Sequence, residues 1–293
     1  MHSIIDSHVH LYPEEVNKDP IQWAEVNQEK QWKILCTRKR RDNSPVQLFP
    51  TVSELLKAMD DACVERSVLM GWYWETESSC EMQNAFYKSL INSHADRFSA
   101  FASVHPKTKQ IKSLIKKLKD DGFSGLGELS PHSQGVAIRE KSLSEILTAA
   151  SELAMPVNLH VSDPDSRRYE GYVETPLKDF IALAKRFPKT RFILAHLGGL
   201  LPVKYPEVRD LENIYYDTAA LPLLYESALW PLFLSHVDSS KILYGSDYPL
   251  RLYPSKTVKT GVSDFIQALE SSCPSEITRA ALLAGNIKAI LKL

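Results

Sequence analysis

The chain has 293 residues, of which 44% are hydrophobic and 24% charged, and its formal net charge is −1. This composition excludes disordered, collagen-like and coiled-coil proteins. The near-neutral charge argues against a nucleic-acid scaffold with a broad basic face. The N-terminal residues do not resemble a signal peptide, no apolar run is long enough to span a membrane, and the four scattered cysteines form no disulfide framework. We expect a cytoplasmic protein that binds neither nucleic acid nor membrane.

Eight short apolar runs predict strands, and their starts from the second onward lie roughly 22–35 residues apart, the period of a βα unit. The runs cover residues 3–11, 67–74, 98–105, 124–129, 156–161, 191–197, 213–218 and 241–245. Amphipathic stretches predict helices over 52–64, 110–119, 143–153 and 177–187, the first of them capped by Thr51 or Ser53. This alternation predicts a single-domain α/β protein, a (β/α)8 TIM barrel over 1–293. A doubly wound open sheet is disfavoured because His-Val-His stands where that fold places a glycine-rich turn.

Residues 13–50 form an unusually long connection between the first strand and the first clear helix. It carries Trp23, Trp32 and the basic run 38–41, and its length predicts a functional insertion or lid. The basic run can attract an anionic substrate, although such runs are usually solvated surface. Between strands six and seven the gap is short and contains two prolines, which predicts a stub of helix.

Ionisable residues stand where the apolar runs end, which in a barrel is the catalytic face. His8 and His10 end the first run, and residues i and i+2 of a strand point to the same side. Four later runs end in an ionisable residue each, namely Glu128, His160, His196 and Asp247. Burying each of these groups singly would be costly, so packing does not explain them. Together they predict a metal site, with Zn²⁺ as first choice and Mn²⁺ or Fe²⁺ as alternatives.

The motifs around these residues resemble the amidohydrolase superfamily, in particular the amidohydrolase-2 branch, which also contains decarboxylases of the aminocarboxymuconate-semialdehyde type. The matching pieces, in the family's order, are DSHVH at 6–10, GLGEL at 125–129, NLH at 158–160, LAHLGG at 194–199 and YGSDYP at 244–249. The resemblance covers nearly the whole chain and implies a metal at His8, His10, His160 and Asp247. His196 would be a second-metal ligand in binuclear members and a catalytic residue in mononuclear ones.

Glu128 departs from many superfamily hydrolases, which carry a carboxylated lysine on the fourth strand. A glutamate there resembles the bridging carboxylate of TatD-like nucleases and of some amidohydrolase-2 proteins. A carboxylate can bridge two divalent ions, so Glu128 is predicted as a ligand and the site holds one or two metals per chain. The alternative is a glutamate that orients one of the histidines.

The predicted function is a metal-dependent hydrolase of a lactone, ester or amide. The metal would polarise the carbonyl and activate water, Asp247 would accept the proton, and His196 would stabilise the oxyanion or protonate the leaving group. The alternative is a lyase of the same fold, a non-oxidative decarboxylase or hydratase of a small unsaturated or aromatic acid. A TatD-like nuclease is disfavoured by the charge balance, and a non-catalytic binding barrel by the complete ligand set.

Four residues are candidates for substrate binding. Arg251 follows Asp247 closely enough to clamp a substrate carboxylate, or it forms a salt bridge at the rim. Trp72 and Trp74 end the second run as pocket walls or rim packing, and His132 follows the fourth strand as a pocket residue or a solvated one. The expected partner is a small-molecule substrate, and the aromatic residues near the insertion suggest a homodimer.

Overall fold

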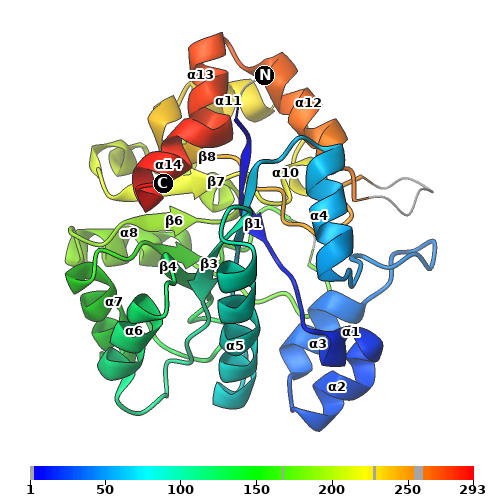
Figure 1. The fold of residues 1–293 in the computed structure, drawn as a ribbon. Coiled ribbons are helices and arrows are strands. Elements are labelled where there is room, and N and C mark those ends of the chain that lie inside the picture. The colour runs from blue at the N-terminus through cyan, green and yellow to red at the C-terminus, as the bar shows by residue number, and fades with distance from the viewer. Residues whose placement is uncertain (1–2, 167, 227–228, 254–259) are drawn as a thin grey trace.

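Eight parallel strands form the centre of the molecule, a computed structural model that describes residues 3–166, 168–226, 229–253 and 260–293 (Figure 1). The strands pair in chain order, and Ser7 N donates to Tyr244 O at 2.8 Å, which joins the eighth strand to the first. The predicted (β/α)8 barrel is therefore confirmed. Its strands are β1 (Ile5–Val9), β2 (Arg66–Leu69), β3 (Phe98–Ala102), β4 (Gly125–Leu129), β5 (Val157–Leu159), β6 (Phe192–Leu194), β7 (Ile214–Asp217) and β8 (Ile242–Leu243).

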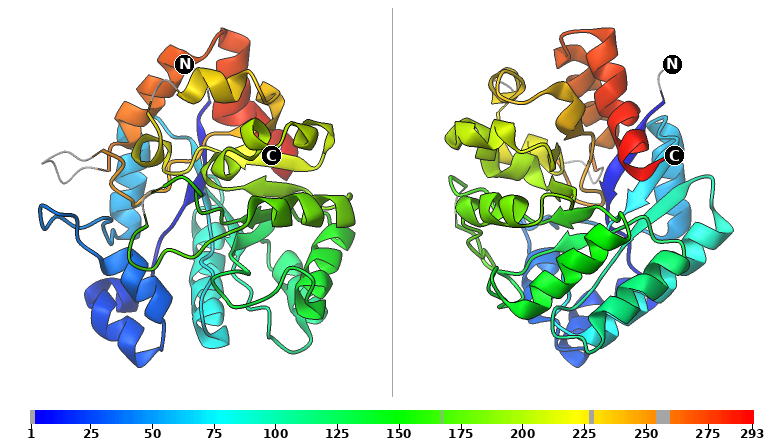
Figure 2. Two further views of the ribbon diagram at one scale, coloured as in Figure 1. Left: turned by 180° about the vertical axis from the view of Figure 1, so that it is seen from behind. Right: turned by 90° about the vertical axis from the view of Figure 1, so that its left-hand side faces the viewer.

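Helices surround the strands as the amphipathic periods predict (Figure 2). The Thr51 side chain accepts from Glu54 N and caps the first of them, with Glu54 bonding back to Thr51 N. The short connection after β6 holds only helical stubs, as its prolines predict. The helices after the insertion are α4 (Val52–Asp61), α5 (Glu77–Ser93), α6 (Ile111–Asp120), α7 (Lys141–Glu152), α8 (Leu177–Arg186), η1 (His196–Leu200), α9 (Leu201–Lys204), η2 (Pro206–Asp210), α10 (Leu221–Leu224), α11 (Leu229–Leu234), η3 (Ser239–Lys241), α12 (Val262–Ser272), α13 (Glu276–Ala280), η4 (Ala281–Gly285) and α14 (Asn286–Leu291).

α5 has no counterpart among the predicted helices, because its buried face mixes polar residues with apolar ones. The polar members are Ser79, Gln83 and Asn84. Gln83 Oε1 accepts from Trp72 N, and Asn84 Nδ2 donates to Ser103 O. These side chains satisfy backbone groups of the strand ends, so the helix has a weak apolar period. None of the helices in the described ranges is long and apolar enough to cross a membrane.

The interior of the barrel is an apolar cluster, and the C-terminal helix covers it at the N-terminal ends of the strands. Ile5, Val68 and Phe101 belong to this cluster together with Ile287 and Ile290 of α14. The Lys288 ammonium donates to Ser3 Oγ, and Arg191 donates to Ile290 O, which fixes α14 beside the N-terminal ends of β1 and β6. The opposite, C-terminal end of the barrel remains available for polar side chains.

The predicted insertion is largely helical and comprises α1 (Glu14–Lys18), α2 (Pro20–Val26) and α3 (Lys30–Thr37), which gather at one side of the barrel (Figure 1). Its aromatic residues pack against the segment that follows β2. Trp32 and Trp74 are both fully buried, with ring centroids 5.6 Å apart. The insertion therefore shares a hydrophobic core with the barrel rim.

A buried carboxylate also attaches the insertion to the barrel. Glu29 is fully buried and accepts hydrogen bonds from Glu75 N at 2.8 Å, Thr76 N at 3.1 Å and Thr76 Oγ1 at 2.8 Å. A carboxylate is suited to three donors because it is an acceptor only. This contact holds the start of α3 against the start of α5.

Replacing this carboxylate by an amide should destabilise the protein. Glu29→Gln keeps the size of the side chain but points an amide donor at other donors, which we expect to cost about 1–3 kcal/mol of unfolding free energy. Urea unfolding measures the change. Glu25→Gln on the exposed side of α2 is the control, with an expected effect within about 0.5 kcal/mol. Equal unfolding midpoints for the two variants would contradict the attachment.

Candidate metal centre

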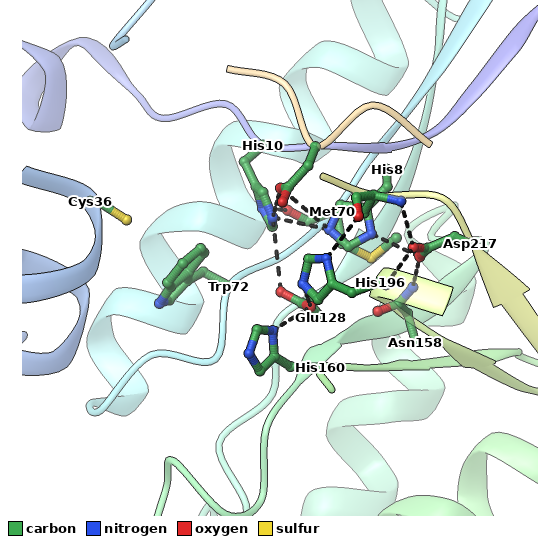
Figure 3. Close-up of polar contacts among 12 residues, drawn as sticks. His8, His10, Cys36, Met70, Trp72, Glu128, Asn158, His160, His196 and Asp217 are labelled. Carbon is green, nitrogen blue, oxygen red and sulfur yellow. Dashed lines mark hydrogen bonds and ion pairs between the residues drawn. The ribbon is translucent and has the colours of Figure 1, made fainter. Parts of the chain in front are cut away.

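The C-terminal ends of five strands bring the six predicted metal-site residues together, and Figure 3 labels all of them except Asp247. His8 lies in β1 and His10 directly after it, while Glu128 lies in β4. His160 follows β5, His196 comes after β6, and Asp247 comes after β8. His8, His10, Glu128 and His196 are buried, while His160 and Asp247 are partly exposed. A cluster of this composition can bind a divalent cation.

The two histidines of the first strand converge through their Nε2 atoms, which lie 3.1 Å apart. His8 Nδ1 donates to Asp217 Oδ2 at 2.9 Å, and His10 Nδ1 donates to Met70 O at 3.1 Å. These acceptors assign a hydrogen to each Nδ1 and leave each Nε2 as the ligating atom. Asp247 Oδ1 lies 3.5 Å from His10 Nε2 and 3.9 Å from His8 Nε2. Two imidazole nitrogens and a carboxylate oxygen thus point at a common position, so the donor set fits a metal ion.

Glu128 stands between two potential ligand groups. One group is His8, His10 and Glu128, and the other is Glu128, His160 and His196, with all ligand atoms of a group within 4.8 Å of one another. Glu128 Oε1 accepts from His160 Nδ1 at 2.9 Å and lies 3.8 Å from His196 Nε2, while Oε2 lies 3.9 Å from His10 Nε2. The two carboxylate oxygens therefore face different groups, as a bridging ligand requires.

A left-handed turn directs His196 into the cluster. Residues 196–200 all have positive φ, which includes Gly198 and Gly199 at 59° each. A Cβ on Gly198 would lie 2.9 Å from the Tyr216 ring, so both the backbone conformation and the space require glycine there. His196 Nδ1 donates to Ala219 O at 3.0 Å, which leaves Nε2 directed at Glu128.

The sequence analysis did not single out Asp217, a fully buried carboxylate at the end of β7. It accepts from His8 Nδ1 and Asn158 Nδ2 at 2.9 Å each, and from the backbone N–H groups of His196 at 3.1 Å and Ala219 at 3.0 Å. A signal was present in the sequence, because Asp217 stands near the end of the seventh apolar run, as the predicted metal-site residues stand near the ends of theirs. Here, however, the residue orients a candidate ligand.

Carboxylates control the charge of the histidine pair. Burial disfavours a protonated His8, but the adjacent Asp217 outweighs burial and raises the pKa of His8 to about 10. Burial and the neighbouring His8 lower the pKa of His10 to about 4. Burial opposes ionisation of Glu128, yet His160 beside it holds the pKa of that carboxyl well below its usual value. The carboxylates therefore stabilise positive charge at this position, which is either the proton on His8 Nε2 or a divalent cation that replaces this proton.

The cluster opens into a cavity of about 700 Å³ at the C-terminal face of the barrel. Trp72 lines this cavity and contacts His10 edge-on, with ring centroids 5.2 Å apart. Tyr73 also lines it, beside His160. All four residues of the basic run 38–41 line the opposite part of the cavity, so the insertion contributes to the site.

Three predicted substrate-binding residues are not among the described residues that line the cavity. Trp74 is buried against the insertion, and its Nε1 donates to Gln83 Oε1 at 2.7 Å. His132 Nε2 contacts Asp179 Oδ2 at 2.9 Å, on the outer side near α8. Arg251 is only 2% exposed and donates to Pro45 O at 3.2 Å, so it supports the backbone of the insertion. Tertiary packing has turned these three side chains away from the cavity.

Comparison with known proteins gives a family for this architecture. The family model described as amidohydrolase matches residues 5–293, and a search of curated sequences finds no significant relative. A 5-carboxyvanillate decarboxylase from Novosphingobium aromaticivorans, solved with manganese and 4-hydroxy-3-methoxy-5-nitrobenzoic acid, has a TM-score of 0.76 and 14% identity, with 100% of this chain and 96% of that chain covered. A 2,6-dihydroxybenzoate decarboxylase from Rhizobium has a TM-score of 0.68 and 18% identity, with 100% and 99% covered. An amidohydrolase II structure has a TM-score of 0.72 and 19% identity, with 99% and 100% covered.

At these identities the solved structures support the fold alone, whereas the family model spans nearly the whole chain. The barrel, the ordered motifs and this match lead to one conclusion: the chain belongs to the amidohydrolase family.

Proposed function

We propose that this protein is a metal-dependent decarboxylase of small aromatic or unsaturated carboxylic acids. The observation that carries the proposal is the composition of the cavity, in which a histidine–carboxylate cluster faces aromatic and cationic side chains. Such a cavity suits a planar anion, with the ring beside Trp72 and Tyr73 and the charge near cations. Similar structures that are decarboxylases of aromatic acids support the same reaction class.

This proposal replaces the hydrolase as the leading interpretation. In the sequence, Glu128 mildly favours hydrolysis because it allows a second metal, and the two overlapping ligand groups still permit one. Yet a binuclear site does not itself select a reaction, whereas the anion-binding cavity suits an acid substrate. Hydrolysis of a lactone or ester remains the second candidate, supported by the position of Glu128 between the groups.

The residues of the chain supply the proton that decarboxylation needs. In this reaction the bond between the carboxyl group and the adjacent carbon breaks, CO₂ leaves, and the carbon takes up a proton in its place. Asp247 is suited to deliver that proton because it is partly exposed to the cavity and lies 3.5 Å from His10. His196 lies across the cluster with its Nε2 directed inward. A divalent cation held by His8, His10, Asp247 and His160 or Glu128 would neutralise the substrate carboxylate and withdraw charge from the reacting carbon.

The metal is proposed as Mn²⁺ or Zn²⁺. The sequence alone placed Zn²⁺ first, and manganese is bound in three of the similar structures. Imidazole and carboxylate ligands accept both ions, so availability and geometry select between them. The small-molecule substrate belongs to this proposal, and the homodimer stays a prediction.

Asp247→Asn tests the reaction directly. The amide keeps the shape and one oxygen ligand but cannot deliver a proton, so we expect kcat for CO₂ release from hydroxybenzoic acids to fall roughly 10²–10⁴-fold. Release of CO₂ and formation of the decarboxylated product are measured with Mn²⁺- or Zn²⁺-loaded protein, and metal content is checked in the variant. A wild type that hydrolyses lactones or esters but releases no CO₂ would overturn the proposal.

Removing the histidine pair tests the metal site. The double variant His8→Ala/His10→Ala should lose bound metal and activity together while keeping its circular dichroism spectrum, because the barrel core lies at the opposite end. Elemental analysis gives the metal-to-protein ratio. His94→Ala serves as the control, because His94 is the C-cap of α5 and is not one of the predicted site residues. This variant should bind metal as the wild type does. An unchanged ratio in the double variant would show that the ligands lie elsewhere.

Glu128→Gln separates one metal from two. If Glu128 bridges two ions, the wild type approaches two metals per chain and the variant, lacking a negative charge, loses the second ion first. If Glu128 only orients His160, the wild type saturates at one metal, and the variant binds it roughly 10–100-fold more weakly. Metal titration followed by elemental analysis distinguishes the two. Saturation of the wild type at one metal would refute the bridging role.

A further inference from the structure

The cavity has a second polar wall, which lies opposite the histidine–carboxylate cluster and is formed by the insertion. Residues 35, 36, 38–41, 46 and 47 line this part of the cavity. In Figure 3, Cys36 of the insertion lies on the far side of Trp72 from the histidines. Trp72, the cluster and the insertion all line the same cavity, so one substrate can contact both walls.

Arg38 is the cation of this wall that is best placed to bind a ligand. Its guanidinium carbon lies 4.3 Å from the centre of the Tyr169 ring, and both residues line the cavity. Stacking on an aromatic ring uses the face of the guanidinium and leaves the N–H groups at its edge for an acceptor. Within the part of the chain that the structure describes, the Arg38 side chain has no carboxylate partner, and its Nε has no hydrogen bond.

Gln47 adds a second donor beside Arg38. The two residues belong to adjacent extended segments, since Val46 N donates to Arg38 O at 3.3 Å. Gln47 is only 7% exposed and lines the cavity, and among the described residues its amide contacts only the thiol of Cys36, a weak acceptor. A buried donor that lacks a strong acceptor is better satisfied by an oxygen of a bound ligand. Two such donors from neighbouring residues indicate that an acceptor-only group binds here.

The other charged groups of the cavity already have partners or lie in solvent. The Arg40 guanidinium donates to the carbonyl oxygens of Arg251 and Tyr253, which makes it part of the insertion's framework. Lys39 and Arg41 are exposed. On the loop after β5, Asp165 pairs with Lys204.

The remaining carboxylate of that loop, Asp163, is turned toward its own loop. Its Oδ1 accepts from Asp165 N at 2.9 Å. The charge of Arg38 is therefore not neutralised by a contact with this carboxylate.

We propose that Arg38, assisted by Gln47, binds a second anionic group of the substrate, such as a carboxylate or a sulfonate. This inference rests on the proposed function and narrows the substrate class to dianionic acids: one carboxylate lies at the histidine–carboxylate cluster and the other anion at Arg38. Arg38 then takes the clamping role that the sequence analysis assigned to Arg251. A guanidinium edge and an amide donor match the two oxygens of a carboxylate.

Binding of three related compounds tests the inference. Benzoate, isophthalate and 3-sulfobenzoate are titrated calorimetrically into metal-loaded wild type. We expect both dianions to bind roughly 10–100-fold more tightly than benzoate, since each gains charge-assisted hydrogen bonds. A preference for isophthalate over 3-sulfobenzoate identifies a carboxylate site, and the reverse order identifies a sulfonate site.

Substitution of Arg38 supplies the decisive comparison. Arg38→Gln should remove the preference for dianions and leave benzoate affinity unchanged, whereas Arg38→Lys should restore part of the preference because it keeps the charge but not the planar edge. Arg209→Gln removes the same charge from the exposed η2 turn and should retain the full preference.

The inference is wrong if wild type binds benzoate and both dianions equally, if it binds none of them, or if Arg38→Gln weakens all three ligands alike. It is also wrong if the preference survives in Arg38→Gln. These outcomes are separate from the reaction itself, because a protein that prefers dianions through Arg38 yet releases no CO₂ would keep the anion site and lose only the proposed decarboxylation.

Discussion

The arrangement of the centre depends on one buried carboxylate, Asp217. A buried charge is tolerated only where donors compensate its lost hydration, and Asp217 receives four donors. They come from β1, from Asn158 in β5, and from two backbone groups that follow β6 and β7. The same hydrogen bond that satisfies Asp217 fixes the His8 ring, so that its Nε2 faces His10 rather than the barrel wall. The contacts that satisfy Asp217 in the folded barrel therefore also orient a candidate ligand.

The two ends of the barrel have different roles: the N-terminal end contributes to stability, and the C-terminal end carries the candidate site. At the N-terminal end, α14 and the interior apolar side chains form a core without ionisable groups among its members. At the C-terminal end, the strands finish in histidines and carboxylates whose charges balance one another. Changes at the rim can therefore alter chemistry while the core keeps the fold, which explains how proteins at 14–19% identity share one architecture.

The insertion forms one wall of the cavity at the C-terminal face of the barrel. Its aromatic cluster and Glu29 attach it to the segment after β2, and the basic run lines the same cavity as the predicted metal-site residues. Arg40 holds the segment by bonding to the carbonyl oxygens of residues 251 and 253, while Arg38 stacks on Tyr169 of another loop. Neighbouring arginines thus serve structure and recognition separately, since their surroundings differ.

The sequence by itself determined the barrel and indicated where its candidate site lies. The alternation of apolar runs with amphipathic stretches is a local periodicity, so it can be recognised in the sequence. The ionisable residues at the strand ends can also be recognised there, because burying a charge without a partner is costly. Side-chain direction at the rim was decided only by the tertiary structure. Trp72 and Trp74 were both candidates for the pocket wall, but only Trp72 lines the cavity, because β2 ends at Leu69 and the alternation of a strand no longer holds beyond it. Two further features depend on contacts between segments distant in sequence, which no local pattern encodes. One is that Arg38 rather than Arg251 lines the cavity, and the other is the hydrogen bond between Asp217 and His8.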